Sequence, residues 1–369
     1  MRRKTTRVRT GTGRAAALAL GLALGLAGPA AAELETLARF GPETPPGNVT
    51  VSPDGRIFMS LHRFYGPELR VVEVLEGGET RPYPTADWAR APEGDGPGLN
   101  GVLGLRADRQ GVLWLLDGRT DAAAGRLVAW DTRAERLSRV ITLAAPVTRP
   151  DSFLNDLAVD LGQGAIYIAD SGGAESGALI VVDIATGRAR RVLEGSPFTT
   201  PEDVDMVIDG RVIALGGAPA RIGVNPITLD PAGEHLYFGP MNATSLYRVR
   251  TRDLLDETLS PEALAARVAR YGDKPVSDGS TVDGAGNVYI SDVGANAIGV
   301  TGPDGAYRVL HQDPALSWPD AFSFGPDGRI YAVINELHRS PPLNGGDDGS
   351  QGLFKLVAFP PLAPGAVGR

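Results

Sequence analysis

The chain has 369 residues, of which 36 are Lys or Arg and 44 are Asp or Glu, and it contains no cysteine. The lack of cysteine excludes disulfides, thiol nucleophiles and thiolate-ligated metals. Six of the basic residues and none of the acidic ones lie in residues 1–32, so the rest of the chain carries a net charge of −14. This negative charge disfavours nucleic acid and anionic lipid as partners.

Residues 1–32 have the pattern of a secretory signal peptide. Basic residues from Arg2 to Arg14 are followed by an apolar stretch of Ala, Leu and Gly over residues 15–27, and Ala30 to Ala32 supply small residues for cleavage. An uncleaved membrane anchor is the alternative. The pattern predicts a secreted or periplasmic protein that has no contact with the membrane after cleavage.

One short sequence motif occurs six times along the remaining chain. Each copy has a glycine-centred turn followed by a run of β-branched and aromatic residues, and successive turn glycines lie 42–69 residues apart. A repeat of this length, formed by a hairpin and further strands, indicates a β-propeller. We therefore expect an all-β fold, a single six-bladed β-propeller over residues 33–360. The turn glycines are Gly55, Gly111, Gly164, Gly233, Gly286 and Gly328.

Other elements are predicted in chain order around these hairpins. Residues 34–40 are expected to close the ring by adding an outer strand to the last blade, which removes an exposed sheet edge. A helix is expected over residues 260–270, with Ser260 as its N-cap and Pro261 at its first position. The loop over residues 339–350 is rich in Pro, Gly and Asp. Residues 361–369 are expected to form a disordered tail.

Polar residues recur where the inner strands begin and where the next strands end. In a hairpin these two points lie at the same mouth of the central channel, whereas the glycine turns lie at the other mouth. Asn48 and Asn100 lie near the strand starts, displaced by one and three positions. The strand starts carry Asn155, Asp156, Asn225, Asp278 and Asp320, and the strand ends carry His62, Asp117, Asp170 and Asn335.

Two interpretations of these residues remain open. Asp and Asn at strand ends commonly bond loop backbone, which is a purely structural use. Alternatively, Asn155, Asn225 and Asp278 converge on the channel axis and offer oxygen ligands to a divalent cation such as Ca²⁺ or Zn²⁺. Trp318 and Phe153 are candidates for an aromatic rim, and His338 follows a strand that ends at the same mouth.

Phrases spread over residues 80–359, among them PDSFLNDLAVD, VNPITLDPAGEHLYFGP, NVYISDVGANAI and LSWPDAFSF, resemble the bacterial branch of the yellow/major royal jelly protein family. The resemblance implies a secreted six-bladed propeller. Insect members are associated with dopachrome conversion, with binding of small biogenic amines or with nutrition. This chain lacks the cysteines of its insect relatives.

The chain also resembles, more distantly, the gluconolactonase and senescence-marker propellers. In those proteins a Glu, an Asn and an Asp at inner-strand starts, with a further Asn nearby, hold a divalent cation. Asn155, Asn225 and Asp278 fall on that pattern, but Gly47 and Asn48 stand where the Glu is expected.

Three functions are compatible with these observations. The first is an exported, yellow-like propeller, monomeric by default, that binds a small polar or aromatic metabolite at the channel mouth and isomerises a dopachrome-like compound. The second is a divalent-cation-dependent lactonase that uses Asn155, Asn225 and Asp278, and the third is a ligand-binding module without catalysis. An isomerase needs an acid and a base, for which the candidates are Asp156, Asp170, Asp278, Asp320 and His338. The candidate ligand-binding residues are Asn100, Asp117, Phe153, Trp318 and Asn335.

Overall fold

The computed structural model describes residues 1–2, 4–6, 33–94, 96–118, 120, 124–173 and 175–369. It has two units, Met1–Ala31 and Ala32–Arg369, and the helices and strands found among the described residues lie in the second. Nearly all of the predicted signal peptide falls outside the described residues. Within the described part, no helix is long and apolar enough to cross a membrane.

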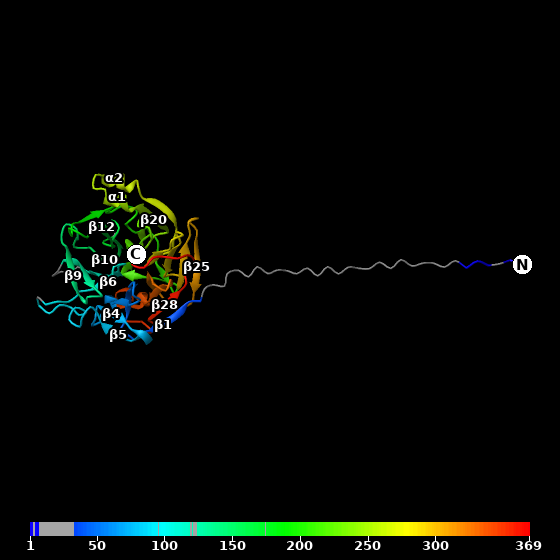
Figure 1. Ribbon diagram of the computed structural model, residues 1–369, viewed down its shortest axis with the longest axis horizontal. Coiled ribbons are helices and arrows are strands. Elements are labelled where there is room, and N and C mark those ends of the chain that lie inside the picture. Colours follow the sequence, from blue (N-terminus) through cyan, green and yellow to red (C-terminus); the bar gives the residue numbers. More distant parts are fainter. Residues whose placement is uncertain (3, 7–32, 95, 119, 121–123, 174) are drawn as a thin grey trace. The chain divides into compact units, whose positions relative to one another are not determined.

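Six four-stranded antiparallel sheets are arranged in a ring, which confirms the six-bladed propeller (Figure 1). Blade 1 contains β2 (Pro46–Val51), β3 (Ile57–Leu61), β4 (Val71–Val74) and β5 (Thr80–Pro82), and blade 2 contains β6 (Val102–Ala107), β7 (Val112–Asp117), β8 (Gly125–Asp131) and β9 (Arg136–Leu143). Blade 3 contains β10 (Leu154–Asp160), β11 (Ala165–Asp170), β12 (Ala178–Asp183) and β13 (Ala189–Val192).

The second half of the ring is built in the same way. Blade 4 contains β18 (Val224–Leu229), β19 (His235–Pro240), β20 (Ser245–Arg250) and β21 (Ala269–Asp273), and blade 5 contains β22 (Ser280–Val282), β23 (Val288–Asp292), β24 (Ala297–Thr301) and β25 (Tyr307–Gln312). Blade 6 contains β26 (Pro319–Phe324), β27 (Ile330–Ile334) and β28 (Lys355–Phe359), with β1 (Glu35–Arg39) paired antiparallel to β28 as its outermost strand.

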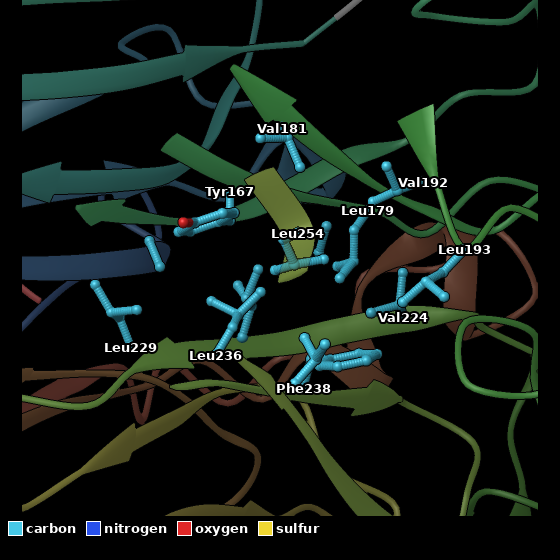
Figure 2. Packing of buried hydrophobic residues seen from close by; sticks show 14 of the residues in the cluster. Tyr167, Leu179, Val181, Val192, Leu193, Val224, Leu229, Leu236, Phe238 and Leu254 are labelled. Atoms are coloured by element: carbon cyan, nitrogen blue, oxygen red, sulfur yellow. The ribbon is translucent and has the colours of Figure 1, made fainter. Parts of the chain in front are cut away.

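The blades pack face to face, so most inner strands are buried on both sides. Figure 2 shows one such interface, where Tyr167 and Leu179 of blade 3 lie close to Leu236 and Phe238 of blade 4. Leu254, from the short helix α1 (Thr251–Leu255), fills the same cluster. This packing explains why the apolar runs in the sequence barely alternate with polar residues.

The helix expected over residues 260–270 is shorter than predicted. Helix α2 spans Pro261–Ala265, and the Ser260 hydroxyl accepts a hydrogen bond from the Ala263 amide at 3.2 Å, so its predicted start is correct. Residues 269–273 instead form β21, because blade 4 needs an outer strand to pair with β20.

An insertion between blades 3 and 4 was not anticipated from the sequence. Residues 201–222 contain two short hairpins, β14 (Val207–Ile208) with β15 (Arg211–Val212) and β16 (Ala214–Leu215) with β17 (Ala218–Pro219). Met206 and Ile208 of this insertion belong to one buried cluster with Leu337 and Leu343. The loop after β27 therefore packs against the insertion through its short helices η3 (Leu337–Arg339) and η4 (Pro341–Leu343).

The segment from residue 361 to 369 differs from the expected disordered tail. The Leu362 amide donates to the Tyr289 hydroxyl at 2.5 Å, and the Gly284 amide donates to the Pro364 carbonyl at 2.8 Å. Arg369 lies 3.4 Å from the Asp160 carboxylate of blade 3. These partners come from different blades at the glycine-turn face, and the C-terminal end lies over the centre of the ring (Figure 1).

The inner strands approach one another so closely that glycine is required at their contacts. A Cβ atom at Gly279 would lie 2.0 Å from the backbone oxygen of Asp320 in the next blade. We therefore expect Gly279→Ala to lower the free energy of unfolding by at least about 2 kcal/mol, because the clash is with backbone that cannot rotate away. Gly41, which has no atom within 4 Å of such a Cβ, is the matched control. Equal thermal denaturation midpoints for Gly279→Ala and Gly41→Ala would contradict this account of ring closure.

Candidate functional site

A cavity of about 50 Å³ lies at the mouth where the inner strands begin, which we call the site mouth. A single buried water needs about 10–15 Å³, so the space holds several waters or part of a small organic molecule. Its polar wall is formed by Asn48, Asn155, Asp156, Asn225, Asp278 and Asp320. Its apolar wall includes Phe64, Phe153, Met241, Trp318, Leu337 and Leu343.

β-Bulges place most of the polar wall. The pairing register shifts at the start of the inner strand in blades 1, 2, 3, 4 and 6. Bulges re-aim side chains next to functional sites. In each of these blades, two residues of the inner strand lie between the paired residues that flank the register shift. Among these bulge residues are five that line the cavity: Asn48, Asn155, Asp156, Asn225 and Asp320. Asn48 occupies the second of the two bulge positions in blade 1, whereas Asn225 and Asp320 occupy the first in their blades, which accounts for its displacement by one position in the sequence pattern.

Blade 5 has no such bulge, and loop contacts position Asp278 instead. The amides of Asp278 and Gly279 both donate to the Ser291 hydroxyl, at 2.8 and 3.0 Å. The buried Lys274 ammonium donates to the carbonyl of Met241 and to the hydroxyl of Ser277, each at 3.1 Å. Lys274 therefore ties the loop that carries Asp278 to the turn that carries Met241. Burial lowers the pKa of Lys274 to about 7.

Each cavity carboxylate has at least one strong hydrogen-bond donor. The Asn48 side chain donates to Asp156 at 2.6 Å, and the Asn335 side chain donates to Asp320 at 2.6 Å. Asp278 accepts from the Asn225 amide at 2.6 Å and from the Trp318 indole at 2.7 Å. These bonds hold the three carboxylates in place, but they leave the negative charges within a single buried cluster.

Burial and mutual repulsion favour the protonated forms of these carboxylates. Burial, and secondly the charge of Asp278, raise the pKa of Asp156 to about 7 against the lowering effects of Arg106 and Asn48. Burial likewise raises the pKa of Asp278 to about 6. The pKa of Asp320 is raised well above its ordinary value, first by burial and then by Asp278 and Asp156. The site therefore gains negative charge near neutral pH.

Arg106 is a cation of the channel interior that sequence reasoning missed. It is 5% exposed and lies on β6, and its guanidinium donates to the Phe322 carbonyl at 3.1 Å. Its charge opposes the rise in the pKa of Asp156. The feature of the sequence that could have revealed Arg106 is the presence of a single arginine in the otherwise apolar segment GVLGLRA.

Trp318 holds a strained backbone conformation at the cavity. Its φ angle is 58°, in the left-handed region that bulky residues rarely adopt. Its indole nitrogen bonds Asp278, and its ring stacks on His338 with 8° between the planes. Such strain is frequent at functional sites, where the surrounding structure enforces it.

Two of the predicted site residues at strand ends have structural partners instead. Asp117 accepts from the backbone amides of Asn100 and Gly101 and forms an ion pair with Arg126. Asp170 accepts from the Phe153 amide and pairs with Arg191 at 2.5 Å. Neither aspartate lines the cavity, and Asn100 is a partner of Asp117 outside it. Their carboxylates are therefore occupied in holding the loops that precede β6 and β10.

His338 and Asn335 lie behind the cavity wall. His338 is fully buried, and its Nε2 lies 3.3 Å from the Asp209 carboxylate of the insertion. Asn335 bonds Asp320 and accepts from the Leu337 amide at 3.1 Å. These two residues support Trp318 and Asp320 rather than facing the cavity. The cavity itself exposes His62, Phe64, Leu103, Ile222, Met241, Leu337 and Leu343, of which only His62 drew attention in the sequence.

The three proposed metal ligands form one hydrogen-bonded chain. The Asn155 amide donates to Asn225 at 2.5 Å, and the Asn225 amide donates to Asp278. The described residues contain no group of three His, Asp or Glu side chains arranged to hold a metal ion. Among them, however, the Asn48 Oδ1 atom is buried without a hydrogen-bond partner. Amide and carboxylate oxygens are the ligands that Ca²⁺ prefers, so this donor set fits a hard cation.

The raised pKa values predict a loss of stability on raising the pH. A carboxyl group whose folded-state pKa is raised stabilises the fold below its unfolded pKa, and this contribution is lost as the pH rises through the folded-state value. For Asp156 the window runs from about pH 4 to about pH 7. We expect the free energy of unfolding of the wild type to fall over this range. In Asp156→Asn the fall should be smaller by about 2–4 kcal/mol. Denaturant unfolding at pH 4.5 and 8 measures the difference. Glu43→Gln, at an exposed position, is the control, and parallel curves for the two variants would refute the assignment.

Solved structures with the same architecture share little sequence with this chain. A gluconolactonase from Xanthomonas campestris has a TM-score of 0.57 at 14% identity, covering 89% of both chains. A calcium-binding protein, regucalcin, from Agrobacterium tumefaciens has a TM-score of 0.54 at 18% identity, covering 90% of this chain and 98% of its own. At these identities the likeness establishes the fold alone.

Sequence comparison gives a more specific relationship. Major royal jelly protein 1 of Apis mellifera is 25% identical over 264 residues, which are 66% of this chain and 59% of the bee protein. Major royal jelly protein 2 is 26% identical over 248 residues, 59% of this chain and 53% of the bee protein. The match thus spans little more than half of each relative. The family model for major royal jelly proteins matches residues 100–339, and the chain belongs to this family.

Proposed function

We propose that this protein binds a small organic cation with an aromatic or apolar body in the cavity at the site mouth. The observation that carries the proposal is the cluster of three buried aspartates, whose ionisation the fold disfavours even with the charge of Arg106 nearby. A cationic ligand group next to these carboxylates relieves their repulsion and replaces the lost hydration.

The apolar wall supports a ligand with a flat or hydrophobic body. Trp318, Phe153 and Phe64 contribute aromatic surfaces, and Met241 contributes a thioether that adapts to irregular shapes. Aromatic faces also attract cations, which adds to the preference for an amine. Arylalkylamines and catecholamines combine both features.

The same residues suit a proton-shifting reaction on a bound carbonyl compound. Isomerisation of a dopachrome-like substrate requires a base that removes a proton beside a carbonyl and an acid that returns it. Asp278 and Asp156 have pKa values near neutrality, at which one carboxylate can accept a proton while its neighbour still holds one. We propose this chemistry as the catalytic extension of ligand binding. The signal-like pattern of residues 1–32 is consistent with this protein acting after export.

Calorimetric titration with tyramine tests the binding proposal. We expect affinity to rise from pH 5 to pH 8, because a cation binds the ionised carboxylates and expels their protons. Asp278→Asn should weaken binding at pH 8 by about tenfold or more, the effect of losing a charged hydrogen bond. Asp304→Asn, at an exposed turn, should bind as the wild type does. Absence of binding by aromatic amines and catechols, or equal affinity in both variants, would refute the proposal.

Dopachrome turnover by the same proteins tests the isomerase step.

A divalent-cation-dependent lactonase is the second candidate, favoured by the chain of Asn155, Asn225 and Asp278 and by the unpaired oxygen of Asn48. Asn48, Asn155, Asn225 and Asp278 would hold the ion. Such an ion supplies a Lewis acid that polarises a lactone carbonyl or activates water.

Native mass spectrometry before and after chelation tests this candidate. The lactonase predicts one Ca²⁺ or Zn²⁺ per chain, removed by chelator and absent in Asp278→Ala, and lactone hydrolysis that returns with the ion. A protein without stoichiometric metal, or hydrolysis that is indifferent to chelator, would exclude it.

A further inference from the structure

His62 is the histidine of the cavity wall, and its ring is held in one orientation. It lies one residue after β3 and is 5% exposed. Its backbone amide donates to the Pro45 carbonyl at 2.8 Å, and its carbonyl accepts from the Tyr65 amide at 3.1 Å. The edge of the ring contacts Phe64, with centroids 4.7 Å apart.

The hydrogen bonds of His62 define which ring nitrogen carries the proton. Nδ1 accepts from the backbone amide of Phe64 at 3.3 Å and caps the short helix η1 (Arg63–Tyr65). A nitrogen that accepts an amide proton has none of its own, so in the neutral ring the proton lies on Nε2. Among the described residues, the hydrogen bond to Nδ1 is the one that the His62 side chain forms.

The ring also stays neutral across the physiological range. Burial, reinforced by the charge of Arg63, lowers the pKa of His62 to about 3. His62 therefore differs from the aspartates of the same cavity, which change their charge near neutral pH. It presents a donor without a positive charge, and a neutral imidazole in this state can polarise a carbonyl.

We propose that the Nε2–H group of His62 binds an oxygen of the ligand, so that the ligand carries a carbonyl acceptor in addition to the group that meets the aspartates. This inference rests on the proposed function and narrows its substrate class to compact aminocarbonyl compounds. In the isomerase reaction, the same hydrogen bond stabilises the enolate oxygen that forms when an aspartate removes the neighbouring proton.

Two substitutions separate this role from the helix cap. His62→Asn keeps an acceptor for the Phe64 amide but has no atom at the position of Nε2. His62→Gln places an amide N–H group near that position. A capping role alone predicts that His62→Asn behaves as the wild type, whereas a ligand-binding role predicts loss in His62→Asn and partial rescue in His62→Gln. His235→Gln, at a partly exposed position outside the cavity, is the control.

The first measurement needs no ligand. ¹⁵N NMR spectra of the histidine-labelled protein, with His62 assigned through His62→Gln, should show a neutral Nε2–H ring that does not titrate between pH 5 and pH 8. A ring that titrates in this range, or one protonated at Nδ1, overturns the inference.

The second measurement compares tyramine with the α-amino ketone that differs from it only by a carbonyl in place of the benzylic methylene. We expect His62→Asn to lose about three- to tenfold in affinity for the ketone, the usual effect of one hydrogen bond, and to bind tyramine unchanged. Equal effects on both probes overturn the role of His62 but leave the proposed amine site intact. If neither probe binds the wild type, the proposed function fails and the inference fails with it.

Discussion

Contact among the six innermost strands is the constraint on which the rest of this structure depends. The strands meet so closely that Gly104 and Gly279 have no room for a side chain, since a Cβ atom would lie 2.3 and 2.0 Å from backbone oxygens of the next blade. Ring closure of this kind brings all strand starts to one mouth. Polar residues at that mouth are then removed from water whether or not they find partners, and this explains why three aspartates share one buried cluster.

Burial of this aspartate cluster destabilises the folded state, and the neighbouring polar groups offset the destabilisation only in part. Amide and indole donors from Asn48, Asn225 and Trp318 satisfy single carboxylate oxygens, and Arg106 contributes one positive charge from within the channel. The pKa values of the aspartates nevertheless remain raised, and Trp318 keeps a left-handed backbone. Raised pKa values together with local strain are typical of sites at which a ligand supplies the missing interaction.

The same residue type has two uses at this mouth. Asp117 and Asp170 end the second strands of their blades and bind loop amides and arginines, whereas Asp156 and Asp320 lie in bulges at inner-strand starts and face the cavity. The difference arises from the hairpin geometry, because a bulge turns an extra side chain toward the channel axis while a regular strand end does not. His62 follows β3 at the same mouth, yet a helix cap fixes its ring toward the cavity wall.

The sequence by itself determined the six blades, the absence of disulfides and the mouth at which polar residues gather, because turn glycines and apolar runs are local signals that repeat along the chain. It also grouped Asn155, Asn225 and Asp278 as candidate ligands, and in the structure these three side chains are hydrogen-bonded in a chain. Only the tertiary structure showed that Asp156 lines the cavity whereas Asp170 holds a loop in place. It also revealed the insertion over residues 201–222 and the contacts of residues 361–369 with the glycine-turn face. These features depend on contacts between distant segments, such as His338 with Asp209 and Gly284 with Pro364, which leave no periodic trace in the sequence.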